Sequence, residues 1–258
     1  MIAPHDQSRL VEVVVIGPRD AERAQQGGAN RLLACQLVGP VVRGVDDMRL
    51  MAPADVSAIL RVSDVPVRVT MRLSDGFTTQ GGEFTRLAGL ASEYLALGVE
   101  GFTFGFLTRD LEVDVAVCAA LADRLAGANW SFDRTFDHAL EARRAWRDLS
   151  GLPGLDGIHT GGAMLGLDAG LDDLVTMAAA EPAFASVAIA AGGVRPEQVP
   201  WLVKAGIPRV QLGAAVRPGG SWSKADVDAG FVRSWCTLLD DAIAHEARRG
   251  GAQAENAS

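Results

Sequence analysis

Residues 187–216, VAIAAGGVRPEQVPWLVKAGIPRVQLGAAV, contain a complete strand–helix–strand unit, and the rest of the chain can be interpreted from it. The apolar run 187–191 has the length of a strand and ends at two glycines. Pro196 then stands where a helix can begin, because its missing N–H costs nothing there. The predicted helix 196–205 ends at a glycine, and a second predicted strand, 210–212, follows it. Both strands run into residues with little or no side chain, whose backbone N–H groups can hold an anion.

The same alternation of strand and helix extends over the whole chain. The predicted strands are 10–16, 31–35, 65–72, 101–107, 129–134, 157–160, 187–191 and 210–212. Strict alternation indicates a parallel sheet. Eight such units with a terminal helix, 225–245, favour a closed barrel over an open sheet, and the first strand is not followed by the GxGxxG turn of a dinucleotide-binding sheet. We therefore predict a single (β/α)₈ barrel, the TIM-barrel fold.

Length and composition indicate one domain. The chain has 258 residues, of which 48% are hydrophobic, and its net charge of −8 argues against nucleic-acid binding. Neither a secretory signal pattern nor an apolar run of membrane-spanning length is present in the sequence, so we expect a cytoplasmic protein with no membrane partner. We expect a flexible tail over 1–9, the barrel over 10–247 and a disordered tail over 248–258.

Short motifs occur along the chain in an order that matches one known family. LVEV at 10–13 corresponds to the family motif LEIC, and GGANRLLAC at 27–35 corresponds to GGADRIELC. RLS at 72–74 corresponds to RPR. FDRTFD at 132–137 corresponds to FHRAFD, TGG at 160–162 corresponds to TSGG, and AGGV at 191–194 corresponds to AGGGV. In this order the chain resembles the CutC family of TIM-barrel proteins, named for copper homeostasis. The resemblance implies the barrel fold, a copper-homeostasis role and copper as a candidate ligand.

Several polar positions of the family have other residues in this chain. Leu33 replaces a carboxylate, Ser74 an arginine and Asp133 a histidine, and Gln211-Leu212 replaces a His-Ser pair. The family's chemistry therefore need not carry over. Other polar positions keep the residue types of the family: Glu12, Arg72, Arg134, Asp137 and Thr160.

The candidate catalytic residues are Asp133, His159 and Glu12. Asp133 and His159 end neighbouring strands, roughly 5 Å apart in a sheet, so they could face each other and move protons near neutral pH. The alternative is that one of the two points outward into the helix layer. Glu12 lies among valines and would be costly to bury alone, so we expect it to meet a cation inside the barrel, for which Arg72 or Arg134 would serve.

A second set of residues would bind the substrate. Arg72 could bind a carboxylate or phosphate, or it could pair with Asp75 or Glu12 and hold a loop. Asp137 precedes a predicted helix, 138–149, and we expect it to cap that helix. The candidate substrate-binding residues are Arg72, Arg134, Thr160, Gly192, Gly193, Gly213 and Ala214.

The positions of the sulfur atoms argue against a copper site within one chain. Cu(I) prefers thiolate or thioether ligands, and Cys35 is the only cysteine at the end of a predicted strand. Cys118 and Cys236 fall on predicted outer helices. Met71 is adjacent to Arg72, so at most one of those two side chains points inward. We predict no metal site from these residues and expect Cys35 to be an ordinary buried residue.

Three functions stay open at this point. The first is a CutC-like barrel with a pocket for a small anionic molecule, whose copper-homeostasis role is implied by the resemblance. The second is an enzyme that uses acid–base chemistry on a phosphorylated or carboxylated metabolite. The third is a non-catalytic barrel that acts through subunit or partner contacts, for which Trp222 and Trp235 would suit the interface of a homo-oligomer.

Overall fold

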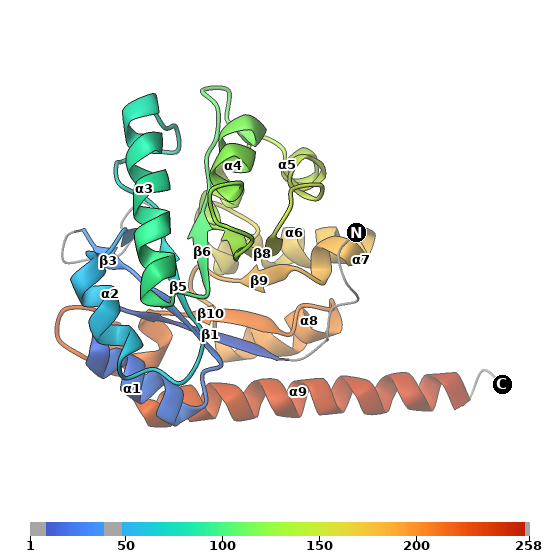
Figure 1. Cartoon of the computed structure of the whole chain (residues 1–258). Coiled ribbons are helices and arrows are strands. Elements are labelled where there is room, and N and C mark those ends of the chain that lie inside the picture. The colour runs from blue at the N-terminus through green and yellow to red at the C-terminus, as the bar shows by residue number, and fades with distance from the viewer. Residues whose placement is uncertain (1–8, 39–47, 256–258) are drawn as a thin grey trace.

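Eight parallel strands close into a barrel (Figure 1), in the order β1-β10-β9-β8-β7-β6-β5-β2. The structure is a computed structural model that describes residues 9–38 and 48–255. Every predicted strand falls on a strand of this barrel, so the predicted TIM-barrel fold is confirmed. The barrel strands are β1 (Leu10–Val15), β2 (Arg31–Ala34), β5 (Val67–Thr70), β6 (Gly101–Phe104), β7 (Asn129–Phe132), β8 (Leu155–Thr160), β9 (Ala188–Ala190) and β10 (Arg209–Leu212).

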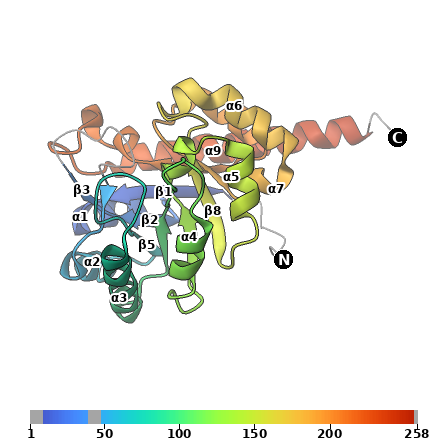
Figure 2. The same ribbon diagram turned by 90° about the horizontal axis from the view of Figure 1, so that it is seen from above.

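Helices surround the barrel, with α2 and α3 on one side and α6 and α7 on another (Figure 2). Gly28 and Gly98 follow α1 and α3 with φ of 99° and 100°, the left-handed conformation that glycine adopts without strain. The α-helices are α1 (Pro18–Gly27), α2 (Pro53–Leu60), α3 (Gly81–Leu97), α4 (Val115–Ala122), α5 (Ala142–Leu149), α6 (Leu167–Ala180), α7 (Pro182–Ala185), α8 (Val199–Lys204) and α9 (Ala229–Glu255). The 3₁₀ helices are η2 (Arg134–His138), η3 (Pro196–Gln198), η4 (Ala214–Val216) and η5 (Pro218–Gly220).

Two predicted helices are divided in the structure, and α2 begins at a proline. It begins at Pro53 because a proline inside a helix would remove a hydrogen bond, whereas the first position tolerates it. Before it, β4 (Met48–Arg49) pairs antiparallel with β3 (Gln36–Leu37), and 39–47 lie outside the described residues. The helix expected at 138–149 is divided into η2 and α5, and the one expected at 196–205 into η3 and α8.

The C-terminal helix is longer than predicted. It continues past residue 245 to Glu255 and projects beyond the barrel (Figure 1), so the expectation of disorder from residue 248 is wrong up to that point. A helix that has already formed adds further residues at little cost, which explains how a polar sequence extends it. Within the described residues, no helix combines the length and the apolar character that a membrane crossing requires.

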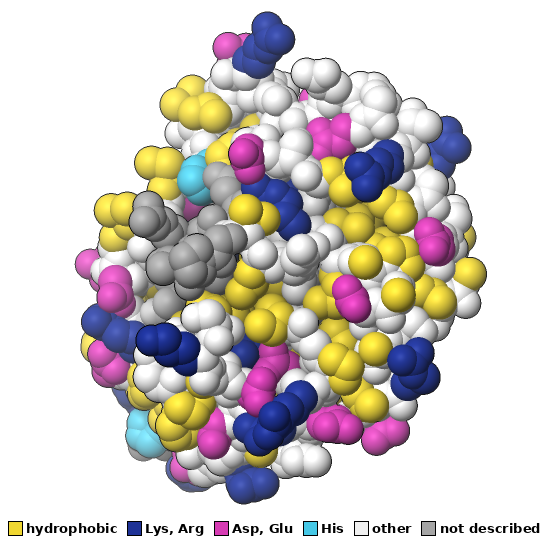
Figure 3. All heavy atoms as spheres, turned by 90° about the vertical axis from the view of Figure 1, so that its left-hand side faces the viewer, with side chains coloured by type: hydrophobic (Ala, Val, Ile, Leu, Met, Phe, Trp, Pro, Cys, Tyr) yellow, Lys and Arg dark blue, Asp and Glu magenta, His cyan; other side chains and the backbone are white. Residues whose placement is uncertain are grey.

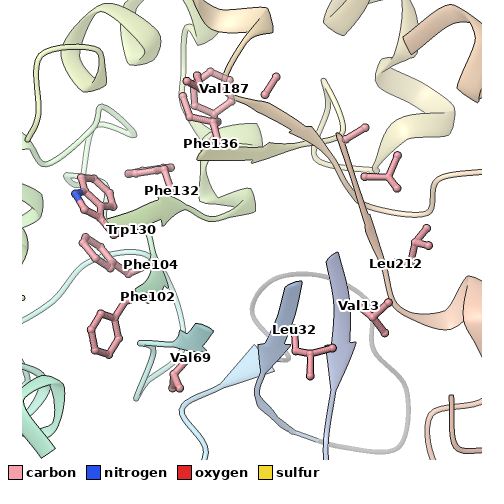
Figure 4. Packing of buried hydrophobic residues seen from close by; sticks show 14 of the residues in the cluster. Val13, Leu32, Val69, Phe102, Phe104, Trp130, Phe132, Phe136, Val187 and Leu212 are labelled. Atoms are coloured by element: carbon pink, nitrogen blue, oxygen red, sulfur yellow. The ribbon is translucent and has the colours of Figure 1, made fainter. Parts of the chain in front are cut away.

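The strands separate two environments. Apolar side chains such as Val13, Leu32, Phe102 and Leu212 belong to one buried cluster (Figure 4), which also contains residues of the surrounding helices. Because successive side chains of a strand point to opposite faces, the residues between them point into the barrel. Many of these inward residues are polar and buried, among them Glu12, Arg31, Arg68, Thr70, Arg72, Thr103, Ser131, Asp133 and His159.

Arg68 fills the N-terminal end of the barrel. Its guanidinium donates to Asp156 Oδ2 at 2.5 Å, to Ser131 Oγ at 2.7 Å and to Glu100 Oε2 at 3.0 Å, and the residue is 1% exposed. Glu100 directly precedes β6, and Asp156 lies near the start of β8. This set of ion pairs leaves the C-terminal end of the barrel as the end at which a ligand can enter.

Candidate functional site

A cavity of about 290 Å³ lies at the C-terminal ends of the strands. This end of the molecule faces the viewer in Figure 3, where hydrophobic side chains are interspersed with both signs of charge. Most of the predicted site residues line the cavity: Asp133, Arg134, His159, Gly192, Gly193, Gly213 and Ala214. Glu12, Arg72 and Thr160 are not part of its wall. Glu12 lies within hydrogen-bond distance of His159 and Arg72 donates to Asp133, both residues of the wall, whereas Thr160 donates to Asp137, which in turn pairs with Arg134 of the wall.

Glu12 is the centre of a buried network below the cavity. Its Oε2 accepts a hydrogen bond from Arg31 Nε at 2.5 Å, and its Oε1 lies 2.6 Å from His159 Nε2 and accepts from Gln211 Nε2 at 2.8 Å. Glu12 thus meets a cation inside the barrel, as expected, but this cation is Arg31, where the sequence had suggested Arg72 or Arg134. The barrel register places Arg31 and Gln211 directly beside Glu12 on the two neighbouring strands, so they are the closer partners.

The charges of this network are set by its contacts. Burial by itself raises the pKa of Glu12, but the positive charges of Arg31 and His159 outweigh burial and hold that pKa well below its usual range. His159 Nδ1 lies 3.3 Å from the carbonyl oxygen of Phe132. Both ring nitrogens of His159 therefore face oxygen atoms.

Asp133 lines the cavity together with His159, but its side chain hydrogen-bonds to other partners. Its Oδ2 accepts from Arg72 Nη2 at 2.7 Å, and its Oδ1 accepts from the backbone N–H of Thr135 at 2.9 Å. Asp133 directly precedes η2, and an aspartate at that position turns towards the free N–H groups of the helix start. Arg72 thus pairs with Asp133, and Asp75 pairs with Arg49.

Arg134 is held by three acceptors at the edge of the cavity. Its Nε donates to Asp137 Oδ2 at 2.8 Å, and its Nη2 donates to the carbonyl oxygens of Ala163 and Met164 at 3.3 and 3.2 Å. Nη1 donates no hydrogen bond within residues 9–38 and 48–255. A Cβ at Gly192, where φ is +81°, would lie 2.5 Å from Arg134 Cζ, so a glycine is required for the guanidinium to lie against this turn.

Asp137 links two loops and does not cap the helix expected after it. It accepts hydrogen bonds from Thr160 Oγ1 at 2.5 Å and from the backbone N–H of Gly161 at 2.9 Å. Burial raises the pKa of Asp137, and the nearby Arg134 only partly opposes it. Asp137 thus connects Thr160 and Gly161 to Arg134, which lines the cavity.

Sequence reasoning missed two hydroxyl groups in the cavity wall. Thr70 and Thr103 are each 2% exposed, and their Oγ1 atoms have no hydrogen-bond partner in the described part of the chain. Strand periodicity could have found Thr70, because it lies two residues before Arg72 and therefore points to the same face.

The thiols do not fit a copper site within one chain. Among the described residues, no group of three or more His, Cys, Asp or Glu side chains is arranged to hold a metal ion. Burial raises the pKa of Cys35 to about 12 and that of Cys118 to about 12, so both stay protonated at neutral pH, whereas Cu(I) binds the thiolate. Cys35 packs against Val14 and Leu33, and Cys118 and Cys236 lie on α4 and α9.

Comparison with known proteins identifies relatives over most of the chain. The model of the CutC family matches residues 9–216. CutC family proteins of Klebsiella pneumoniae strain 342 and of K. pneumoniae subsp. pneumoniae strain ATCC 700721 / MGH 78578 are each 26% identical over 241 residues, which cover 93% of this chain and 91% of each relative.

Solved structures with the same fold include a putative copper homeostasis protein CutC from Streptococcus agalactiae. It has a TM-score of 0.67 and 16% identity, and the match covers 80% of this chain and 98% of that one. Thiamine phosphate pyrophosphorylase from Pyrococcus furiosus has a TM-score of 0.52 and 14% identity, with 92% and 98% covered. These two structures support the barrel fold, and the family model spans most of the chain. The chain therefore belongs to the CutC family.

Proposed function

We propose that this protein is a cytoplasmic barrel that binds a small phosphorylated or carboxylated molecule in the cavity at the C-terminal ends of its strands. Its family is named for copper homeostasis. Since the thiols do not fit a copper site within one chain, a role in that process would depend on the bound molecule and not on a metal held by this chain.

Arg134 carries the proposal. Its side chain is 12% exposed and fixed by Asp137 and two carbonyl oxygens, while Nη1 keeps its donor capacity at the cavity wall. The backbone N–H groups of Gly192 and Gly193, which also line the cavity, donate no hydrogen bond within the described residues. A guanidinium nitrogen together with two free amides is a set of donors suited to the oxygens of a phosphate or carboxylate.

The buried network below the cavity leaves no unbalanced carboxylate beside it. Glu12 pairs with the guanidinium of Arg31 at 2.5 Å, and this cation balances its negative charge. Charges interact more strongly in a poorly solvated interior than in water, so this pairing keeps Glu12 from repelling a negatively charged ligand.

A thermal-shift screen with phosphate esters and carboxylates tests the proposal. A ligand at roughly a hundred times its dissociation constant stabilises the folded state by about 2.7 kcal/mol, a rise in Tm of about 5 °C or more for a chain of this size. Ala214 is exposed at the cavity wall, so Ala214→Glu should abolish the shift by adding a negative charge, and Ala214→Gln should keep it. No stabilisation by any anion, or equal shifts in both variants, would contradict anion binding.

A second candidate is an enzyme that moves a proton on the bound molecule. Asp133 lines the cavity, and within the described residues each of its oxygens accepts a hydrogen bond from one group, so lone pairs are left for a ligand. Both nitrogens of His159 are engaged, which makes Asp133 the better placed proton acceptor.

Hydrogen exchange tests this second candidate. Anions that stabilise the protein are incubated with it in D₂O, and proton abstraction should bring deuterium into a carbon-bound position of one of them, as followed by NMR. Asp133→Asn should stop the exchange. If every stabilising anion keeps its hydrogens, the protein binds without this chemistry.

A further inference from the structure

We infer that the anion bound here carries hydroxyl groups on a short carbon chain, and that Thr70 and Thr103 bind those hydroxyls. This inference rests on the proposed function and names the substrate class of the same cavity. The inference is based on polar atoms of the cavity wall that the phosphate or carboxylate group of a ligand cannot hydrogen-bond.

Thr70 and Thr103 stand side by side. They are register partners on β5 and β6, and neighbouring strands lie about 4.8 Å apart, so their hydroxyls can reach two adjacent oxygens of one molecule. Both side chains are 2% exposed, both line the cavity, and both Oγ1 atoms lack a partner within the described residues. A buried hydroxyl without a partner destabilises the folded protein, and a bound hydroxyl group would remove that cost.

The same wall offers acceptors that require a donor. Gln211 uses its Nε2 to bind Glu12, while its Oε1 accepts no hydrogen bond in the part of the chain that is described. Asp133 also presents free lone pairs. A bare phosphate or carboxylate has no proton to give to these oxygens, whereas a hydroxyl both donates and accepts. A hydroxylated anion could therefore supply hydrogen-bond partners for these polar atoms of the wall, with its acid group at Arg134.

The rest of the cavity limits the size of the ligand. Leu33, Leu212 and Trp222 form an apolar part of the wall that suits the C–H groups of a carbon chain. A volume of about 290 Å³ is at the low end for ligand sites, which favours a chain of a few carbons.

Isothermal titration with matched ligands tests the inference. Glycerol 3-phosphate is compared with propyl phosphate, and glycerate with propionate, so that each pair differs in hydroxyl groups and the two pairs separate phosphates from carboxylates. The hydroxylated member of at least one pair should bind about tenfold tighter or better, because sites built to bind a hydroxyl strongly reject the analogue that lacks it.

Variants connect this preference to the two threonines. Valine has the shape of threonine without the hydroxyl. The double variant Thr70→Val/Thr103→Val should therefore bind both members of a ligand pair with nearly equal affinity. Its affinity for propyl phosphate or propionate should be unchanged. Thr103→Ser keeps a hydroxyl and should keep the preference. Thr85→Val, at an exposed position on α3, is the matched control and should behave like the unaltered protein.

The outcomes separate the inference from the function on which it rests. If the members of both pairs bind equally tightly, or if the double variant keeps the preference, the inference is wrong and anion binding stands. If none of the four ligands binds, both fail.

Discussion

Glu12 and His159 are 147 positions apart in the sequence, and their side chains meet at 2.6 Å inside the barrel. Their strands, β1 and β8, are separated by β9 and β10, so the contact crosses the interior. Glu12 is fully buried and His159 is 1% exposed. The wall of the cavity is thus connected to a charged centre that solvent does not reach.

Glu12→Gln should destabilise the protein strongly. The change removes the negative charge that balances the buried guanidinium of Arg31, and breaking a buried ion pair costs about 3–5 kcal/mol. Denaturation by urea measures this loss. Glu112→Gln is the control, because Glu112 pairs with Arg144 at the surface, where an ion pair contributes about 0–1 kcal/mol. Similar losses in the two variants would show that the Glu12 network is not a stabilising centre.

The stabilisation from Glu12 should depend on pH with a defined sign. The pKa of Glu12 is lowered in the folded protein from an ordinary value of 4.5, so the unfolded chain takes up a proton first as the pH falls. The stabilisation is therefore complete from about one pH unit above 4.5 and is lost progressively as the pH falls further. The difference in unfolding free energy between the unaltered protein and Glu12→Gln should stay constant from about pH 7 to about pH 5.5 and then narrow. A difference that widens in acid would contradict this assignment.

Gly192→Ala and Gly193→Ala form a matched pair. Both glycines have positive φ, 81° and 90°, so alanine at either position should cost about 1–2 kcal/mol. Only the Cβ at position 192 would also collide with Arg134, while nothing lies within 4 Å of a Cβ at position 193. We expect Gly192→Ala to lower the free energy of unfolding by a further ~1–3 kcal/mol and to remove most of the anion-induced rise in Tm. If the free energy of unfolding falls by the same amount in the two variants, the position of the Arg134 guanidinium does not depend on this turn.

Cys35→Ser should leave copper binding unchanged. The thiol of Cys35 is buried and its pKa is raised to about 12, so it offers no thiolate at neutral pH. Metal analysis of protein without a histidine tag should find less than one copper per chain, before and after the change. One equivalent of copper that disappears in Cys35→Ser would show that this thiol is a ligand after all.

The barrel could be predicted because each of its strands carries its own signal. Apolar runs of strand length and glycines after helices are local features, and strict alternation leaves few arrangements of a parallel sheet. The short pair β3 and β4 carries no such signal, since two residues define no period.

The candidate site was only partly predictable, because periodicity determines which face a residue occupies but not which partner it finds there. Asp133 and His159 do both line the cavity. Asp133 meets Arg72, which extends from β5 across the width of β6, and a long side chain of this kind is not confined to the neighbouring strand. Arg31 could have been chosen for Glu12, because consecutive strands of a barrel are adjacent and the two residues are in register.

The ion pairs of Arg68 have a consequence for how a ligand would enter and leave the barrel. Because this guanidinium fills the N-terminal end, a ligand bound in the proposed cavity would enter and leave through the same opening at the C-terminal end. Leu165, 88% exposed and part of the cavity wall, stands on this route. A protein or a second subunit that covers Leu165 would therefore control both uptake and release at once.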